Sequence, residues 1–276
     1  MLRGLGGSWT NNGLAFTPNG RYVYFTLIPK RFGRGDPSLR LEQVSVATGR
    51  QQLLARGEQP AVSPNGAWLA YVSGEGRSAT ISVRNLASGA TRSVNIWRLL
   101  GRNDILNASL AWLEDGTRLV VLEECCFSLD VATPRHPGPH GTSDSSNGDT
   151  LHLIAISVPT DGGLTARSIA PPGAMRMPET VGTEGARPDS LLTSSFAGHG
   201  DRAVVDRLVI GRSRATLTRL LTIAHAQVLG FDPSGQRLLY IVGHQPPGLW
   251  TASIENRHLS GARLLIPDSQ LAAIAW

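Results

Sequence analysis

AVSPNGAWLAYVS (Ala61–Ser73) is one copy of a pattern that recurs along this chain and sets its architecture. It joins a short apolar run, a tight turn that ends in glycine, and a second, mostly apolar run. Proline presets φ at the start of such a turn, and glycine accepts the positive φ that closes it. The two runs therefore predict the strands of a β-hairpin. Three further copies are clear: Leu14–Ile28, Leu110–Glu123 and Leu229–Val242.

A second hairpin follows the first in each unit. After Ser73 come a predicted strand at Ala79–Leu86, a turn at 87–89 and another strand at Thr91–Asn95. Residues 61–95 thus hold four antiparallel strands. The first and last copies continue in the same way, and the third resumes at Thr150–Val158 after an insertion.

The turn glycines define the period. Gly20, Gly66 and Gly116 lie 46 and 50 residues apart, and Gly235 follows 119 residues later, which leaves room for two units. Four strands per period of about 40–50 residues are typical of a β-propeller. A β-sandwich is the alternative, but it does not require the same turn at the same phase of each unit. We therefore predict an all-β chain, with residues 1–276 forming a single β-propeller domain.

A divergent fourth unit is expected between the third and the last. We place its innermost strand at Leu191–Ala197, its turn at 198–201 and its second strand at Arg202–Ile210. The outer half, Ala215–Ile223, is less regular. Residues 212–227 could equally form a helix, because four apolar side chains there share one helical face: Leu217, Leu220, Leu221 and Ala224.

Five full four-stranded repeats are visible, and one more blade is incomplete. Leu271–Trp276 resembles the innermost strand of a further blade, and residues 1–8 resemble the end of an outermost strand. An open ring would expose two sheet faces to water. The prediction is a six-bladed ring whose last blade is shared between the two termini. The two middle strands of that blade are not visible in the sequence. Either the ring is compressed, or residues upstream of Met1 are missing, where a membrane anchor could lie.

The turns resemble a known repeat. SPNG, FDPSG and TPNG before an aliphatic strand, with outer hairpins such as VSVATGR (44–50), are similar to TolB-like propeller repeats, also called PD40 or WD40-like repeats. The resemblance covers nearly the whole chain and departs in the fourth unit and at 113–115. It implies a binding platform, a sensor domain or an enzyme accessory. It alone suggests an extracytoplasmic location.

Composition limits the classes of partner that the chain is expected to bind. The net charge of +5 is carried by scattered arginines, with Lys30 the one lysine, so no nucleic-acid stripe is expected. No apolar run approaches the roughly 18 residues that span a membrane, and no signal peptide is recognisable. The two cysteines, Cys125 and Cys126, are adjacent and lack the spacing of metal ligands. We expect no cofactor.

The insertion at 133–148 is rich in proline, glycine and serine, and we predict a mobile loop there. His136 and His140 lie four residues apart in it. The prolines prevent the helix that would align them, so a metal site is not favoured.

No nucleophile motif is present, and Asp115, Asp201 and Asp232 occupy turns, where aspartate caps its own backbone. The predicted innermost strands offer apolar and hydroxyl side chains, which argues against a catalytic channel. The connectors between strands and blades instead suggest a partner surface. Its candidate residues are Arg31, Phe32, Arg34, Trp97, Met175 and Met177.

The leading hypothesis is therefore a non-enzymatic binding or sensing module that recognises a protein or a small ligand through its loop face. The alternative is a lactonase- or lyase-like enzyme, or an enzyme accessory, with a site in the central channel. A third option is an open blade edge that recruits a partner strand.

Overall fold

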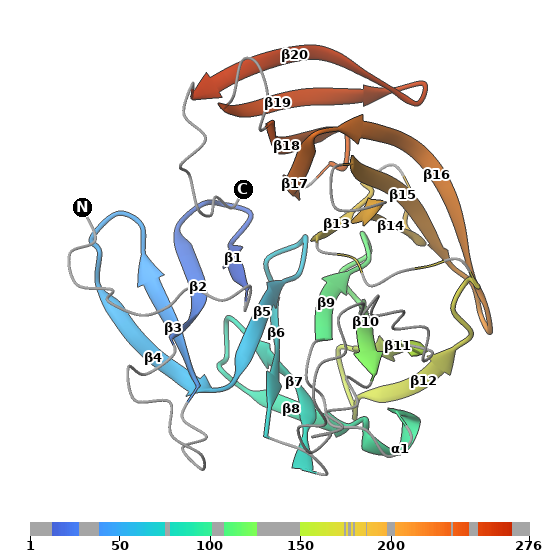
Figure 1. The fold of residues 1–276 in the computed structure, drawn as a ribbon. Coiled ribbons are helices and arrows are strands. Elements are labelled where there is room, and N and C mark those ends of the chain that lie inside the picture. Colours follow the sequence, from blue (N-terminus) through green and yellow to red (C-terminus); the bar gives the residue numbers. More distant parts are fainter. Residues whose placement is uncertain are drawn as a thin grey trace, which may run out of the picture.

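The computed structural model describes residues 13–27, 39–74, 78–100, 108–125, 150–173, 175, 178, 180–185, 187–197, 202–232, 234–242 and 248–266. These residues form five four-stranded antiparallel sheets that are arranged as blades about a central axis (Figure 1). The predicted all-β propeller is confirmed.

Each blade is built in chain order from its innermost to its outermost strand. Blade 1 contains β1 (Leu14–Phe16), β2 (Tyr22–Leu27), β3 (Arg40–Ser45) and β4 (Gln51–Arg56). Blade 2 contains β5 (Glu58–Val62), β6 (Trp68–Ser73), β7 (Thr80–Asn85) and β8 (Thr91–Asn95). Blade 3 contains β9 (Ala108–Trp112), β10 (Arg118–Cys125), β11 (Thr150–Ser157) and β12 (Thr165–Ile169). Blade 4 contains β13 (Thr180–Thr183), β14 (Ser190–Ala197), β15 (Arg202–Ile210) and β16 (Ala215–Ala224). Blade 5 contains β17 (Ala226–Phe231), β18 (Arg237–Val242), β19 (Gly248–Glu255) and β20 (His258–Ile266). A short helix, α1 (Trp97–Leu100), lies between blades 2 and 3.

The recurring turn has the predicted chemistry. In blade 2 the Ser63 hydroxyl donates to Asn65 Oδ1 at 2.7 Å and accepts from the Trp68 amide at 2.9 Å, while Gly66 closes the turn with φ of +70°. The turn thus satisfies its own backbone, which is why it can recur independently of its neighbours.

Blade 4 differs from the prediction by one strand. β13 is the innermost strand, so the segment near Leu191 forms the second strand, β14, and the predicted innermost strand is wrong. The helical alternative for 212–227 is also wrong, because β16 pairs with β15 along its whole length. β13 escapes notice because it is four residues long and has Gly182 at its centre.

The apolar core lies between the blades. In β10, Leu119 and Val121 pack toward blade 2, while Val120 and Leu122 pack toward blade 4. Similar clusters fill the gaps between blades 1 and 2 and between blades 4 and 5. Strands buried on both faces explain the continuous apolar runs in the sequence.

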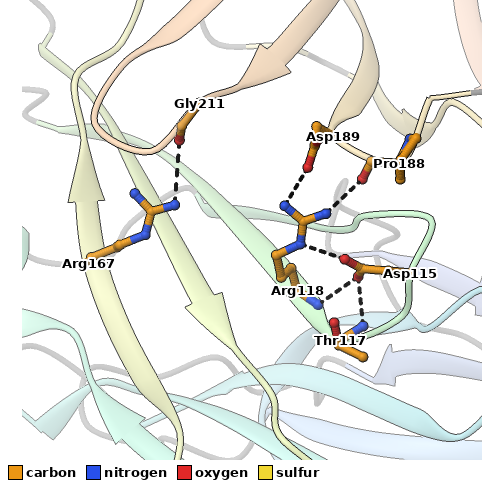
Figure 2. Close-up of polar contacts among 7 residues, drawn as sticks. All are labelled: Asp115, Thr117, Arg118, Arg167, Pro188, Asp189 and Gly211. Carbon is orange, nitrogen blue, oxygen red and sulfur yellow. Dashed lines mark hydrogen bonds and ion pairs between the residues drawn. The ribbon is translucent and has the colours of Figure 1, made fainter.

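Polar contacts add directional links between neighbouring blades. The Trp112 indole donates to the Ala61 carbonyl at 2.9 Å, and the Thr180 hydroxyl donates to the Val228 carbonyl at 3.1 Å. Between blades 3 and 4, Arg118 bonds Asp189 and the Pro188 carbonyl (Figure 2).

The outer rim of the same two blades forms a backbone seam. Ala170, just after β12, pairs in parallel with Arg214: its amide donates to the Ser213 carbonyl and its carbonyl accepts from the Ala215 amide, both at 2.9 Å. Arg167 also reaches the Gly211 carbonyl (Figure 2). Blades 3 and 4 are therefore joined at both their inner and outer parts.

Two predictions fall outside the described residues: the shared blade at 1–8 and Leu271–Trp276, and the mobile insertion at 133–148. Within the described part, no helix has the length and apolar character needed to cross a membrane.

Candidate functional site

The strand order sorts the connections into two groups at opposite ends of the blades. Tight hairpins join first to second and third to fourth strands, and we call this end the turn face. At the other end, which we call the connector face, second strands lead to third strands and each blade leads to the next. The two candidate partner residues that the structure describes, Trp97 and Met175, belong to segments of the connector face.

Trp97 and Met175 are the two candidate residues within the described part. Trp97 begins α1, where its amide donates to Asn95 Oδ1 at 2.9 Å, and its side chain is half-buried. Met175 is half-buried against the cluster between blades 3 and 4, and its amide donates to the Pro172 carbonyl at 3.1 Å. Arg31, Phe32, Arg34 and Met177 lie outside the described residues. The partner surface stays a prediction.

A buried carboxyl group lies at the connector end of blade 3. Glu123 of β10 is fully buried, and neither carboxyl oxygen has a hydrogen-bond partner among the described residues. It pairs across the sheet with His152 of β11 on one side and Ala108 of β9 on the other. Burial raises the pKa of Glu123 to about 7 and lowers the pKa of His152.

Sequence analysis missed Glu123, although a signal was present. In RLVVLE the glutamate continues the face of Leu119 and Val121, which is the face that packs on blade 2. Strand alternation alone would have placed its carboxyl group in the core.

The innermost strands border the centre of the ring (Figure 1). As described, they carry one charged residue, Glu58, and two amide residues, Gln59 and Gln227. Gln59 has φ of +55° at an irregularity in β5, and its buried Oε1 has no partner among the described residues. A search of the described residues finds no group of three metal-ligating side chains.

The turn aspartates in the described part serve their own turns. Asp115 Oδ1 accepts from the amides of Thr117 and Arg118 at 2.9 and 3.1 Å (Figure 2). Burial acts to raise the pKa of Asp115, but these contacts and the Arg118 guanidinium hold it below its usual value. Asp232 caps the equivalent turn of blade 5, with Oδ1 accepting from Gln236 and Arg237. Asp201 lies outside the described residues.

Comparison with known proteins gives a likeness of fold. No family model matches the chain, and no curated protein matches its sequence. TolB from Acinetobacter baumannii is similar over 90% of this chain and 52% of that one, at 13% identity and a TM-score of 0.53. A putative TolB from Agrobacterium tumefaciens is similar over 90% of this chain and 79% of that one, at 12% identity and a TM-score of 0.51. The uncomplexed acylaminoacyl peptidase from Pyrococcus horikoshii is similar over 90% of this chain but 38% of that one, at 12% identity and a TM-score of 0.51.

The chain thus spans about half the length of the first TolB and 38% of the peptidase. At these identities the similarity concerns architecture. The chain is a β-propeller that resembles TolB and the propeller domains of peptidases in structure.

Proposed function

We propose that this propeller is a non-enzymatic binding or sensing module that recognises a protein or a small ligand through its connector face. The observation that carries the proposal is the contrast between the two faces. The described hairpins of the turn face bond their own backbones through polar side chains, whereas the connector face holds Trp97 and Met175 half-buried on the long segments that join blade 2 to blade 3 and blade 3 to blade 4.

The α1 helix that carries Trp97, and the Met175 side chain itself, pack on apolar clusters between blades. Leu99 of α1 packs on the cluster between blades 2 and 3, and Met175 packs on the next cluster along the ring. A supported aromatic or methionine side chain loses little conformational entropy when it binds. Aromatic residues and methionine are also enriched at recognition surfaces.

The alternative is an enzyme or enzyme accessory with a site in the central channel. Such a site needs acid, base or metal-ligating groups that converge from several innermost strands. Glu58 is the one charged residue on the described innermost strands, and this favours the binding role.

We further propose that the scaffold is a six-bladed ring in which Leu271–Trp276 supplies the innermost strand of a shared blade. The face of blade 5 that points away from blade 4 carries the buried side chains of Leu239, Leu249 and Thr251. An apolar sheet face of this kind needs a covering layer.

Site-specific photo-crosslinking tests the recognition proposal. p-Benzoylphenylalanine is placed at Trp97 or Met175, and, as matched controls, at the exposed turn-face residues Thr48 or Ser88. Irradiation in the cells that naturally make the protein, followed by intact-mass analysis, detects protein and small-molecule adducts alike. We expect discrete adducts from Trp97 and Met175. Adducts from the controls alone, or none from either connector position in folded protein, would refute the proposal.

A further inference from the structure

Glu123 occupies an apolar junction. The cluster between blades 2 and 3 runs from Trp68 and Val158 near the turn face to Ile96 and Ala108 near the connector face. Glu123 lies opposite Ala108, at the connector end of this cluster, two strand positions beyond Val121. Leu99 of α1 packs on the same cluster, so the helix adjoins this end of the junction.

Among the described side chains around Glu123, none offers it a fixed countercharge. His152 lies directly across from it on β11, and β9 contributes Ala108 and Leu110. From blade 2, the cluster receives Val72 of β6 and Ile81 of β7 at this end. Arg98 belongs to α1, but its side chain is outside the described part. Among the described side chains at this end of the cluster, His152 is the one that can titrate.

Ionising either group inside the junction is unfavourable. Glu123 is fully buried and His152 is half-buried. A carboxylate without a partner loses its hydration on burial, and a half-buried imidazolium loses part of its hydration. The burial that raises the pKa of Glu123 to about 7 also lowers the pKa of His152. The closed junction therefore favours the uncharged form of each group.

We propose that Glu123 and His152 form a proton-responsive pair that controls the packing of the blade 2–3 junction and, through α1, the connector face. Loss of the Glu123 proton loosens the junction, because water must reach the carboxylate. Protonation of His152 loosens it for the same reason. The consequence for recognition rests on the proposed function, whereas the response of the junction does not.

Glu123 and His152 have opposite effects on how the stability of the closed junction depends on pH. Glu123 binds its proton more tightly in the closed junction than in an open one. The free energy that this proton contributes to closing is therefore full below the ordinary pKa of 4.5 and is lost as pH rises toward about 7. His152 binds its proton less tightly in the closed junction than in an open one. The free energy that the neutral imidazole contributes to closing is therefore full above the ordinary pKa of 6.5 and is lost as pH falls. Separate substitutions are needed to see each effect.

Hydrogen exchange on the isolated full chain tests the proposal without any partner. Protection factors, corrected for the intrinsic pH dependence of exchange, are measured for peptides that cover 93–100 and 118–124. In H152Q, we expect protection to fall roughly fortyfold between about pH 5 and pH 7, if opening restores the ordinary affinity of Glu123 for its proton. In E123Q this fall disappears. E42Q is the matched control, because Glu42 is also buried but pairs with Arg40 at 2.9 Å, and it keeps the response of the unaltered protein.

The proposal would be overturned if protection in H152Q did not change with pH. It would also be overturned if protection in the double variant E123Q/H152Q fell between pH 5 and pH 7 as much as in H152Q. A second measurement covers the case in which a variant fails to fold. The Glu123 Cδ resonance in the unaltered protein is followed by carbon-13 NMR, and a midpoint near neutrality supports the pair. A midpoint near 4.5 contradicts it. A pH response of the junction with no crosslinks at Trp97 or Met175 would support the proton-responsive pair and refute the recognition role.

Discussion

Gly182 fixes the approach of two blades by having no side chain. A Cβ at this position would lie 2.8 Å from Phe231 Cβ and 2.9 Å from its Cδ2, closer than carbon atoms normally come. The backbone of β13 therefore rests against the aromatic ring of blade 5. Any larger residue must push the two blades apart.

We predict that G182A lowers the free energy of unfolding by about 1–3 kcal/mol, because the added methyl group overpacks this contact. Urea denaturation measures the change. G163A is the matched control: nothing lies within 4 Å of a Cβ there, and its effect stays within about 0.5 kcal/mol. Equal effects at the two positions would contradict the contact.

The buried carboxyl group predicts a stability change of the opposite sign. E123L removes a polar group from the apolar junction, and we expect it to raise the free energy of unfolding by about 1–3 kcal/mol near pH 8. Near pH 5 the gain shrinks, because Glu123, with a pKa raised to about 7, is then protonated in the folded protein. Denaturation curves at the two pH values check this. A gain that is independent of pH would refute the carboxylate as its source.

Single residues were predictable where their role is local. The turn at Ser63–Gly66 is satisfied within itself, so its sequence was sufficient to predict it. The environment of Glu123 depends on blade 2, whose Val72 and Ile81 lie 51 and 42 residues earlier in the sequence. Local chemistry does not encode that burial, although strand alternation hinted at it.

At the scale of strands and hairpins, the Arg118 side chain links the β9–β10 hairpin of blade 3 to blade 4. Arg118 bonds Asp115 in its own turn, and Asp189 and the Pro188 carbonyl at the entrance to β14 (Figure 2). Burial acts to lower the pKa of Arg118, but its hydrogen bonds to Asp189 and Asp115 raise it. The guanidinium stays charged, and the link persists across the ordinary pH range.

A double-mutant cycle with R118A and D189A should give a coupling energy of about 0.2–1 kcal/mol, since both side chains are partly exposed. The coupling should decrease in about 1 M salt, where charges are screened within roughly 3 Å. A cycle that pairs R118A with D161A, an exposed hairpin residue, is the control and should give none. Equal coupling in both cycles would show that the link between blades is not specific.

The elements of blade 4 show where prediction from sequence ends. Residues 215–224 have apolar side chains at helical spacing, yet they form β16 because β15 offers a full edge for hydrogen bonding. Thr180–Thr183 has too few side chains to carry a periodic signal, and its pairing with β14 makes it a strand. In both cases tertiary pairing overrides the local pattern.

Across the whole molecule, the innermost strands contact one another in succession from β1 to β17. This order follows from the period of the turn glycines, so the arrangement of blades was predictable. The closure of the ring was predicted from the two terminal segments, and these lie outside the described residues. The six-bladed ring stays a prediction.

Repeat equivalence makes that prediction specific. Ile274-Ala275-Trp276 matches Leu110-Ala111-Trp112 of β9, where the tryptophan indole bonds the carbonyl of Ala61 in the preceding blade. In blade 5 the position equivalent to Ala61, two residues before the turn, is Gly230. Deleting residues 271–276 should therefore increase hydrogen exchange in β18 and β19 and leave β6 and β7 unchanged.

The matched control shortens the insertion at 133–148 to a glycine–serine linker of four residues and should leave exchange in blade 5 unaltered. If the deletion of 271–276 leaves β18 and β19 as protected as before, these residues do not cover blade 5, and the shared blade is refuted.

The parallel seam between Ala170 and Arg214 has a mechanical consequence. Its two backbone hydrogen bonds, at 2.9 Å, clamp the outer rims of blades 3 and 4. When the molecule is stretched from its termini in an optical trap, we expect these two blades to rupture together, as one long extension step. The rest of the array would yield in shorter steps, so the seam divides the molecule into parts of unequal tensile strength.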